Sequence, residues 1–375
     1  MATVTSYGAA GEVTGSRHVF SVNGKQILLD CGLFQGKRQE SYDKSRHFGF
    51  DAAKIDAVIL SHAHLDHCGA LPRLLAEGFK GSIYLTPATA EISEFILLDS
   101  AFLQVRDIEF INKKHRRRGF PEHRPLYTPE DIPGVVARYR KQQYHESFEP
   151  VPGVRCKLLD AGHILGSAQV VLEWGDTENP HRFVFSGDLG RNNLPILNDP
   201  ETPPTPDTLM IETTYGGRLH DPIELVREEL AIEIDRIVAN RGAMLVPAFS
   251  VERTQELLYV LAELVQSGRI PQLPVYVDSP LAKNVTEVFR KHRELVDRDF
   301  RKLLESSDPF GSKAVKFTKT VEDSMALNSM DGPLIILAGS GMCEGGTDSP
   351  PSSQPDCPVE YYRSYRRIYG GEYFR

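Results

Sequence analysis

The stretch Ser61-His62-Ala63-His64-Leu65-Asp66-His67 gathers three imidazoles and one carboxylate within positions 62–67. It comes directly after the apolar run 57–60 and before a helix-like run at 68–75. Such polar side chains are costly to leave unpaired at the end of a buried strand. Because a bound metal would remove that cost, the interpretation of the whole chain starts from this stretch.

The spacing inside the stretch indicates more than one ion. His62 and His64 project to the same side, because side chains of an extended backbone repeat every second residue. Asp66 and His67 would open the helix that follows. Imidazole nitrogen and carboxylate oxygen are ligands that zinc accepts, with manganese or iron as alternatives. Four ligands this close cannot all bind one tetrahedral ion comfortably, so the pattern predicts two neighbouring ions. A solvated histidine-rich turn is the competing interpretation, which a pattern this dense disfavours.

Three isolated residues fall at equivalent places elsewhere. Asp30 ends the strand-like run 27–29, His163 comes just after the run 158–159, and Asp188 follows 183–185. Several parallel strand ends converge on one rim in layered folds, and metal sites are built there. Alone, His163 would be an ordinary histidine, Asp188 a turn residue and Asp30 a cap. With the histidine stretch, Asp30 is placed to hydrogen-bond the back of a ligating imidazole.

Length and composition limit the class of protein. A chain of 375 residues exceeds the usual size of one hydrophobic core, which predicts two domains. Apolar content of 41% and charged content of 25% are typical of soluble globular proteins. There is no apolar run of about eighteen residues that would predict a membrane span, and the first residues do not resemble a signal peptide.

Cysteine usage and net charge narrow the choice of cellular compartment and of binding surface. The five cysteines are odd in number and widely spread, which favours reduced thiols and a cytoplasmic location. The net charge of -8 argues against a generally basic nucleic-acid surface, although it allows a local one. One such local patch is the basic run 113–118, which follows a predicted helix at 88–104. It is interpreted as a solvated face or mobile insertion, with steering of a polyanion as the alternative.

Two strand-to-turn junctions in the second half could bind phosphate. The predicted strand 243–247 leads to Ser250 and a predicted helix at 252–265, and the strand 334–337 leads to Gly339-Ser340-Gly341. A helix that begins beside Ser250 presents unpaired amides suited to a phosphate. Ser250, Ser340 and Gly341 are therefore candidate substrate-binding residues. Simple strand-to-helix turns explain the same spacing equally well.

Taken together, the histidine stretch, Asp30, His163 and Asp188 resemble the metallo-β-lactamase fold in order, residue type and spacing. Further stretches at 211–216, 246–256, 278–282 and 339–346 resemble the β-CASP branch, which comprises RNA-processing nucleases related to the endonuclease of messenger-RNA 3′-end cleavage. The resemblance covers about residues 1–346. It implies an α/β fold: a metallo-β-lactamase αβ/βα sandwich at 1–198, an α/β β-CASP cap domain at 199–346 and an atypical tail at 347–375.

The resemblance also implies roles for individual residues. One zinc ion would be held by His62, His64 and His163, the other by Asp66 and His67, with Asp188 between them. A water shared by the two ions would attack phosphorus. Asp30 would orient a ligand. The catalytic residues would be Asp66, Asp188 and Glu212, the last supporting a histidine that protonates the leaving oxygen. The implied partner is single-stranded RNA, without a membrane, and a homodimer is compatible.

The sequence departs from the family after Gly346. Family members return to the first domain and bring back two histidines, one for the second zinc site and one as general acid, whereas this chain has no histidine after His292. We therefore expect an incomplete second zinc site and missing return strands. The Pro- and Ser-rich start of 347–375 predicts a disordered tail that is not family sequence, with a shifted reading frame as its expected origin.

Two classes of function remain open at this stage. The first is a zinc-dependent ribonuclease whose activity is reduced by truncation. The second is a non-catalytic RNA-binding or scaffold subunit of an RNA-processing complex. Hydrolysis of a small thioester or lactone is a weaker third interpretation because the β-CASP motifs argue against it. The mode of cleavage, endonucleolytic or exonucleolytic, and the RNA sequence preference do not follow from the sequence.

Overall fold

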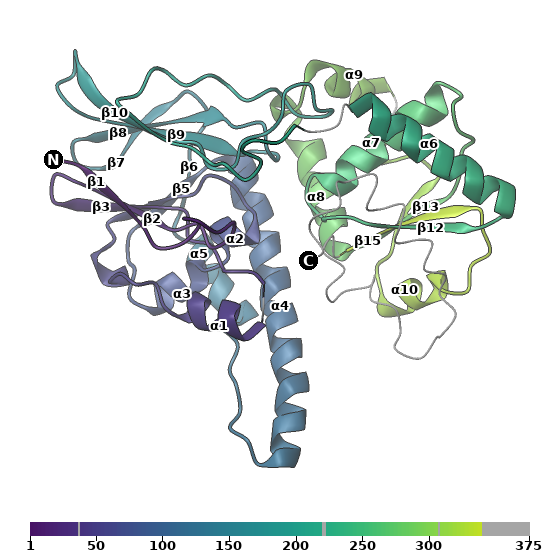
Figure 1. Cartoon of the computed structure of the whole chain (residues 1–375), viewed down its shortest axis with the longest axis horizontal. Helices are drawn as coiled ribbons and strands as arrows, with labels where there is room; N and C mark the ends of the chain where they lie inside the picture. The colour runs from purple at the N-terminus through teal and green to yellow at the C-terminus, as the bar shows by residue number, and fades with distance from the viewer. Residues whose placement is uncertain (37, 220–222, 307, 340–375) are drawn as a thin grey trace. The chain divides into compact units, whose positions relative to one another are not determined.

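The structure is a computed structural model that describes residues 1–36, 38–219, 223–306 and 308–339. The chain divides into two compact units. The first comprises Met1–Asn193 and Asn198–Gly216, and the second comprises Leu194–Leu197 and Gly217–Arg375. The division keeps residues 198–216 with the first unit. Figure 1 labels the elements of both units.

The first sheet of the first unit has six strands in chain order: β1 (Thr3–Ser6), β2 (His18–Val22), β3 (Lys25–Leu29), β4 (Ala57–Ile59), β5 (Ser82–Leu85) and β6 (Tyr139–Lys141). The strands β1 to β3 are antiparallel, whereas β3 to β6 are parallel. The β2–β3 hairpin turns at Asn23-Gly24, both with positive φ of 52° and 73°. Only a few residue types adopt that backbone readily, which is why Asn-Gly favours this tight hairpin.

The second sheet of this unit has five strands in the order β11 (Thr208–Met210), β10 (Pro180–Phe185), β9 (Ala168–Gly175), β8 (Val154–Asp160) and β7 (Ser147–Val151). Both β8 and β10 pair antiparallel with β9, so they run in the same direction. Their carboxyl ends therefore lie at one edge of the sheet.

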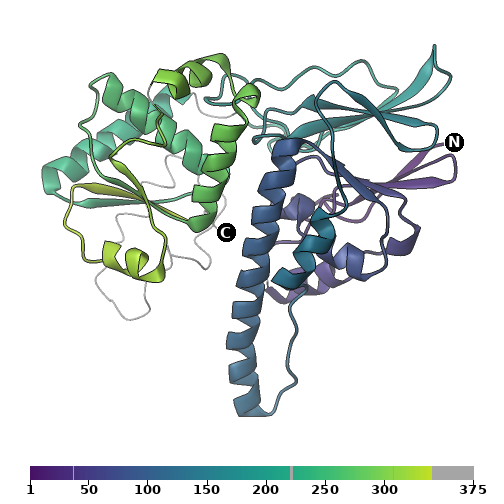
Figure 2. The same cartoon turned by 180° about the vertical axis from the view of Figure 1, so that it is seen from behind.

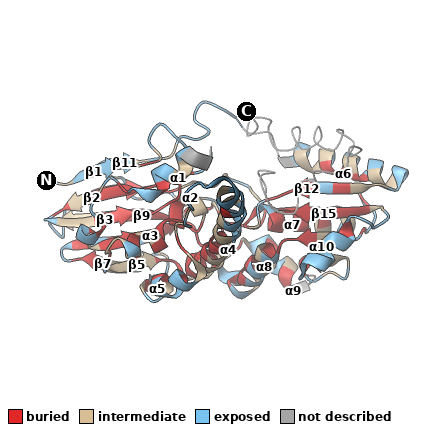
Figure 3. Cartoon of the chain, turned by 90° about the horizontal axis from the view of Figure 1, so that it is seen from below, coloured by how far each residue is buried: buried red, intermediate tan, exposed pale blue. Residues whose placement is uncertain are grey.

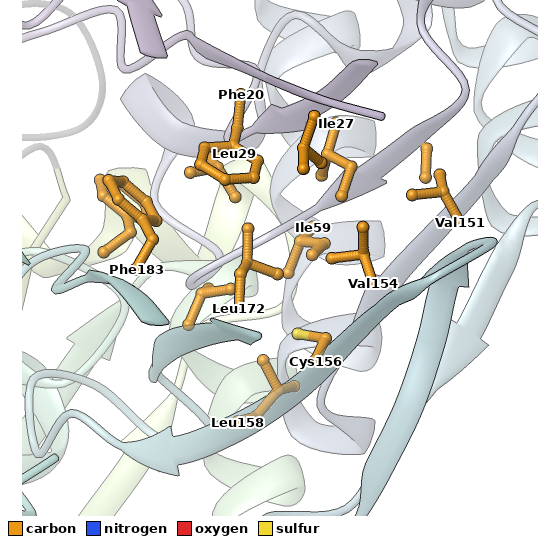
Figure 4. Close-up of a cluster of buried hydrophobic side chains, with 14 of the residues drawn as sticks. Phe20, Ile27, Leu29, Ile59, Val151, Val154, Cys156, Leu158, Leu172 and Phe183 are labelled. Carbon is orange, nitrogen blue, oxygen red and sulfur yellow. The ribbon is translucent and has the colours of Figure 1, made fainter. Parts of the chain in front are cut away.

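The core of the first unit is a layer of apolar side chains contributed by the inner faces of both sheets (Figure 4). Ile27 and Ile59 come from the first sheet, and Cys156, Leu172 and Phe183 from the second. Along β8, buried and exposed residues alternate before the strand end, as expected for a strand with one face in a core. This packing fixes the two sheets against each other and so fixes their edges.

Helices cover the first sheet on the face away from the second sheet (Figure 1). They are α1 (Arg38–Arg46), α2 (Leu65–Cys68), α3 (Leu71–Ala76), α4 (Pro87–Arg118) and α5 (Ile132–Val136), with 3₁₀ turns at Ala52–Lys54 and Pro129–Asp131. The arrangement agrees with the predicted layered α/β fold.

The helix α4 is much longer than the predicted helix at 88–104, and it includes the basic run that was interpreted as a solvated or mobile segment. Thr86 caps its start by accepting a hydrogen bond from the Thr89 amide, and Gly119 ends it in the left-handed conformation, φ 70°. Lysine, arginine and glutamate have good helix propensity, and cations in the last turn are stabilised by the helix dipole. These local effects explain why the helix continues through a polar sequence.

The second unit contains a four-stranded parallel sheet in the order β12 (Ala243–Pro247), β15 (Leu334–Ala338), β13 (Val275–Asp278) and β14 (Val315–Phe317). Its helices are α6 (Ile223–Asn240), α7 (Arg253–Gln266), α8 (Pro280–Lys291), α9 (Arg298–Ser306) and α10 (Val321–Leu327), with a 3₁₀ turn at Arg293–Leu295. The predicted strands at 243–247 and 334–337 and the helix at 252–265 are confirmed. Figure 3 shows buried residues on β12, on β15 and on α7.

Candidate metal centre

The predicted ligands lie at strand ends of both sheets in the first unit. Asp30 follows β3, the stretch 61–67 follows β4, His163 follows β8, and Asp188 follows β10. The parallel strands β3 and β4 end at one edge of the first sheet, and β8 and β10 end at one edge of the second. The structure brings these two edges together, and with them residues more than a hundred positions apart.

Four ligand groups form the first donor set: His62, His64, His163 and Asp188, whose ligand atoms all lie within 4.8 Å of one another. The His64 Nδ1 atom is 3.1 Å from His62 Nε2 and 3.1 Å from His163 Nε2. Zinc–nitrogen bonds of about 2.0–2.1 Å in a tetrahedron place neighbouring donors about 3.3 Å apart. The donor spacing therefore fits one cation of that size.

A second, smaller donor set adjoins the first. His67 Nε2 lies 3.2 Å from Asp188 Oδ1 and 3.9 Å from Asp66 Oδ2. The other carboxylate oxygen of Asp188, Oδ2, lies 3.8 Å from His62 Nε2 and 3.5 Å from His163 Nε2. Asp188 thus presents one oxygen to each donor set, which is the geometry that a carboxylate shared by two cations requires.

Burial differs across the two donor sets. The side chain of His62 is fully buried and that of His67 is 5% exposed, whereas His163 and Asp188 are 25% and 34% exposed. The centre is therefore enclosed on the side of the sheets and open to solvent at His163 and Asp188. A catalytic metal site needs such an open side for water and substrate.

Asp30 organises the back of the centre. Its Oδ2 accepts hydrogen bonds from His67 Nδ1 at 2.7 Å, from the Ser61 hydroxyl at 2.9 Å and from the Ser16 hydroxyl at 3.1 Å. Its Oδ1 accepts the Ser61 amide at 2.8 Å. Since His67 donates through Nδ1, its Nε2 is the ring atom directed at Asp188 and Asp66. Asp30 therefore lies where it hydrogen-bonds the back of the His67 imidazole.

Two serines and one histidine in this network were not predicted. The Ser61 hydroxyl also lies 3.0 Å from His62 Nδ1, so it connects Asp30 to both donor sets. Ser16 in turn lies 3.3 Å from His18 Nε2. Burial lowers the pKa of His18 to about 4, so this imidazole is neutral at physiological pH. Ser61 adjoins the histidine motif and could have been suspected, but nothing in the sequence marks Ser16 or His18.

The protonation states suit cation binding. Burial and the neighbouring His67 hold the pKa of His62 well below its usual value, so its imidazole is neutral. Burial also opposes the charge on His67, but Asp188 and Asp30 outweigh it and raise the pKa of His67 well above its usual value. The pKa of Asp188 is lowered despite its burial, mainly by His67. The proton on His67 therefore sits where a cation would replace it, since metal ligands must give up their protons.

Close backbone contacts hold the short helix α2 in place. The carbonyls of Leu65, Asp66 and His67 accept hydrogen bonds from the amides of Leu33, Ser16 and Cys31, at 2.7–3.0 Å. Gly32 makes this possible, because a Cβ at that position would lie 1.5 Å from the Asp66 carbonyl oxygen. A side chain there would push α2, and hence Asp66 and His67, away from Asp30.

Glu212 lies beside the loop that carries Asp188. It follows β11, and its Oε1 accepts the Leu189 amide at 3.4 Å while its Oε2 accepts the Thr214 amide at 2.9 Å. Its own amide donates to the Ser186 hydroxyl at 3.1 Å. These contacts connect Glu212 to both sides of Asp188 in the chain.

The candidate substrate-binding residues lie in the second unit. Ser250 follows β12, and its hydroxyl is 2.8 Å from that of Ser279, which follows β13. The first two amides of α7, Arg253 and Thr254, donate to the carbonyls of Val251 and Phe249, so these amides are not unpaired as the sequence suggested. Ser340 and Gly341 lie outside the described residues, as does the tail 347–375.

Two family models match this chain. The description "Metallo-beta-lactamase superfamily" matches residues 18–248, and "Beta-Casp domain" matches residues 254–349. The first match covers all six predicted metal ligands and every strand of the first unit except β1.

Several curated proteins are similar over nearly the whole chain. Ribonuclease TTHA0252 of Thermus thermophilus is 39% identical over 92% of this chain and 74% of its own length. Cleavage and polyadenylation specificity factor 73 of Drosophila melanogaster is 30% identical over 90% of this chain and 46% of its own. Transcription termination factor FttA of a Lokiarchaeum species is 32% identical over 92% and 52%, respectively. The chain thus spans about half the length of the last two.

The fold and the donor sets define a protein of the metal-dependent hydrolase class. The chain belongs to the metallo-beta-lactamase superfamily, in the branch that carries a Beta-Casp domain. This agrees with the resemblance seen in the sequence. In the described ranges, no helix combines the length and the apolar character that crossing a membrane requires.

Proposed function

We propose that this chain is a zinc-dependent ribonuclease that hydrolyses phosphodiester bonds of single-stranded RNA at the two donor sets. The single observation that carries the proposal is the placement of Asp188, with one carboxylate oxygen toward each set. The names of the relatives, a ribonuclease and an RNA-processing factor, support RNA as the substrate.

The donor chemistry fits zinc. His62, His64 and His163 would hold one ion, Asp66 and His67 the other, and Asp188 both. Imidazole and carboxylate donors at tetrahedral spacing suit this metal. Two bound zinc ions would lower the pKa of a water between them and stabilise the charge that develops on the phosphate.

The other residues would position these groups. Asp30 fixes the tautomer of His67, and Ser61 keeps Asp30 aligned with His62. Glu212 would hold the loop of Asp188 and, as the family resemblance implies, support the group that protonates the leaving oxygen. Ser250, Ser340 and Gly341 would contact phosphates of the RNA. A homodimer and a cytoplasmic location remain part of the proposal; the free, buried Cys31, Cys68 and Cys156 support a reducing compartment.

The test combines metal analysis with RNA cleavage. Purified protein should contain up to two zinc ions per chain and should cleave a labelled single-stranded RNA. His64→Ala should lose one zinc ion and the activity. His47→Ala, which removes an exposed histidine outside both donor sets, serves as the matched control. Equal cleavage by the wild type and His64→Ala would show that the donor sets are not the source of the activity. Binding of RNA without cleavage by a zinc-loaded wild type would favour the non-catalytic scaffold instead.

A further inference from the structure

The distal half of α4 and the segment that returns from it form a helical arm, residues 102–126. The buried residues of α4 are confined to its first half, up to Ala101, with the single exception of Asn112. Figures 1 and 2 both show α4 extending well past the other helices of the first unit. A helix that projects without packing against a core needs another reason for its length, because isolated helices are marginally stable in water.

The returning segment is fastened to one side of this helix. Asn112 donates through Nδ2 to the His123 carbonyl and accepts the His123 amide, both at 2.9 Å. Gln104 accepts the Leu126 amide at 3.1 Å, and Arg116 pairs with Glu122 at 3.1 Å. The arm is therefore a built element with a defined inner side, and its outer side is left free to contact something else.

The outer side carries a stripe made of apolar and basic residues. At 3.6 residues per turn, its seven members fall within a sector of about 120°. They are Phe102, Leu103, Arg106, Phe110, Lys113, Lys114 and Arg117, all of them exposed. The acidic residues Asp107 and Glu109 fall outside this sector. The stripe therefore combines three apolar side chains with four positive charges and no negative one.

Both the exposed apolar side chains and the uncompensated positive charges of the stripe are unusual for a solvated helix face. Phe102 is 61% exposed and Phe110 is 59% exposed, so the returning segment covers neither ring. Lys114 lies over the ring of Phe110, with Nζ 4.2 Å from the ring centroid. Within the described part of the chain, none of the four cations of the stripe forms an ion pair. In a chain with net charge -8, a run of uncompensated cations is a local exception.

We propose that the stripe binds single-stranded RNA, with the phenylalanines stacking on bases and the cations contacting phosphates. Aromatic rings interleaved with positive charges are how proteins bind single strands without reading their sequence. A second copy of the chain fits less well, because two such stripes would bring four positive charges against four. The proposal rests on the proposed ribonuclease function for the choice of RNA, and it adds a binding surface separate from the metal centre.

The experiment measures binding of a fluorescent phosphorothioate uridine RNA, which resists cleavage, to the full chain at several salt concentrations. Lys113→Gln with Arg117→Gln should weaken binding and make the log–log salt dependence shallower by about 1.4, since each phosphate contact on a single strand contributes about 0.7. Phe102→Ala with Phe110→Ala should weaken binding about 30-fold or more at every salt concentration and leave the slope unchanged. The matched control is Lys54→Gln with Lys80→Gln, which removes two exposed charges near the starts of β4 and β5, away from the metal centre.

Two results would overturn the proposal. One is that both arm variants bind RNA as tightly as the control. The other is that they lose self-association or binding to phosphatidylserine vesicles while keeping their affinity for RNA, which would assign the stripe to a second copy or a membrane surface. The ribonuclease proposal fails separately: a wild-type chain that binds RNA through the arm but cleaves none leaves the arm proposal standing. If the wild-type chain cleaves RNA and both arm variants bind RNA as tightly as the control, the ribonuclease proposal stands and the arm proposal fails.

Discussion

Each unit of this protein places functional candidates at the carboxyl ends of strands that run in the same direction within a sheet, but the two edges carry different chemistry. In the first unit the strand ends present imidazoles and carboxylates, with five of the donors held within a few ångströms of Asp188 or of one another. In the second unit they present hydroxyls, Ser250 against Ser279. The first set suits cations and the second suits a neutral or anionic group. The strand edge thus provides the position, and the residue types decide what binds there.

The largest expected effect comes from removing the carboxylate that the two donor sets share. Asp188→Ala should lower RNA hydrolysis about 10³-fold or more, because a metal ion contributes several kcal/mol of transition-state stabilisation. Zinc content, measured on the same sample, should fall below that of the wild type. His47→Ala should change neither quantity. Full zinc content in Asp188→Ala would show that the two sets do not depend on this carboxylate.

A smaller effect is expected from Ser61→Ala. The substitution removes the hydroxyl that connects Asp30 to His62 while leaving every donor in place. Zinc affinity should fall about 10- to 100-fold, as is usual for residues that orient metal ligands. Competition with a chromogenic chelator measures this. Unchanged affinity would mean that the backbone alone aligns His62.

Gly32→Ala tests whether the first edge depends on close backbone packing. The added Cβ would collide with the Asp66 carbonyl, so we expect a loss of about 2 kcal/mol in the free energy of unfolding, measured with urea. Gly134→Ala is the matched control. It lies in α5, where the nearest atom to a new Cβ is 3.8 Å away, and should slightly stabilise the helix. Equal stability of both variants would contradict the packing described around α2.

The smallest effect is expected from a substitution at the strand edge of the second unit. Ser250→Ala should raise the KM for RNA about 3- to 10-fold through the loss of one hydrogen bond, with kcat and zinc content unchanged. A fall in zinc content would place Ser250 with the donors and would remove the contrast between the two edges.

The sequence predicted the parts of the centre that are local or that recur at strand ends. His62, His64, Asp66 and His67 are adjacent in the chain, and His163 and Asp188 each follow a recognisable strand. The contacts of Ser16 and Gly32 were not predicted because they depend on how distant segments pack. The length of α4 was underestimated because its distal half lacks apolar periodicity. Helix propensity and the cap at Gly119, rather than burial, account for that half.

The β2–β3 hairpin has one more consequence. Ser16 and Asp30 flank its two strands, and the pairing of His18 with Leu29 sets how far apart they lie. A shift of one residue in this pairing would turn alternate side chains to the opposite face. The turn at Asn23-Gly24 therefore fixes the register that holds Ser16 beside Asp30. The orientation of His67 by Asp30 thus depends on a turn that lies five residue pairs along the hairpin.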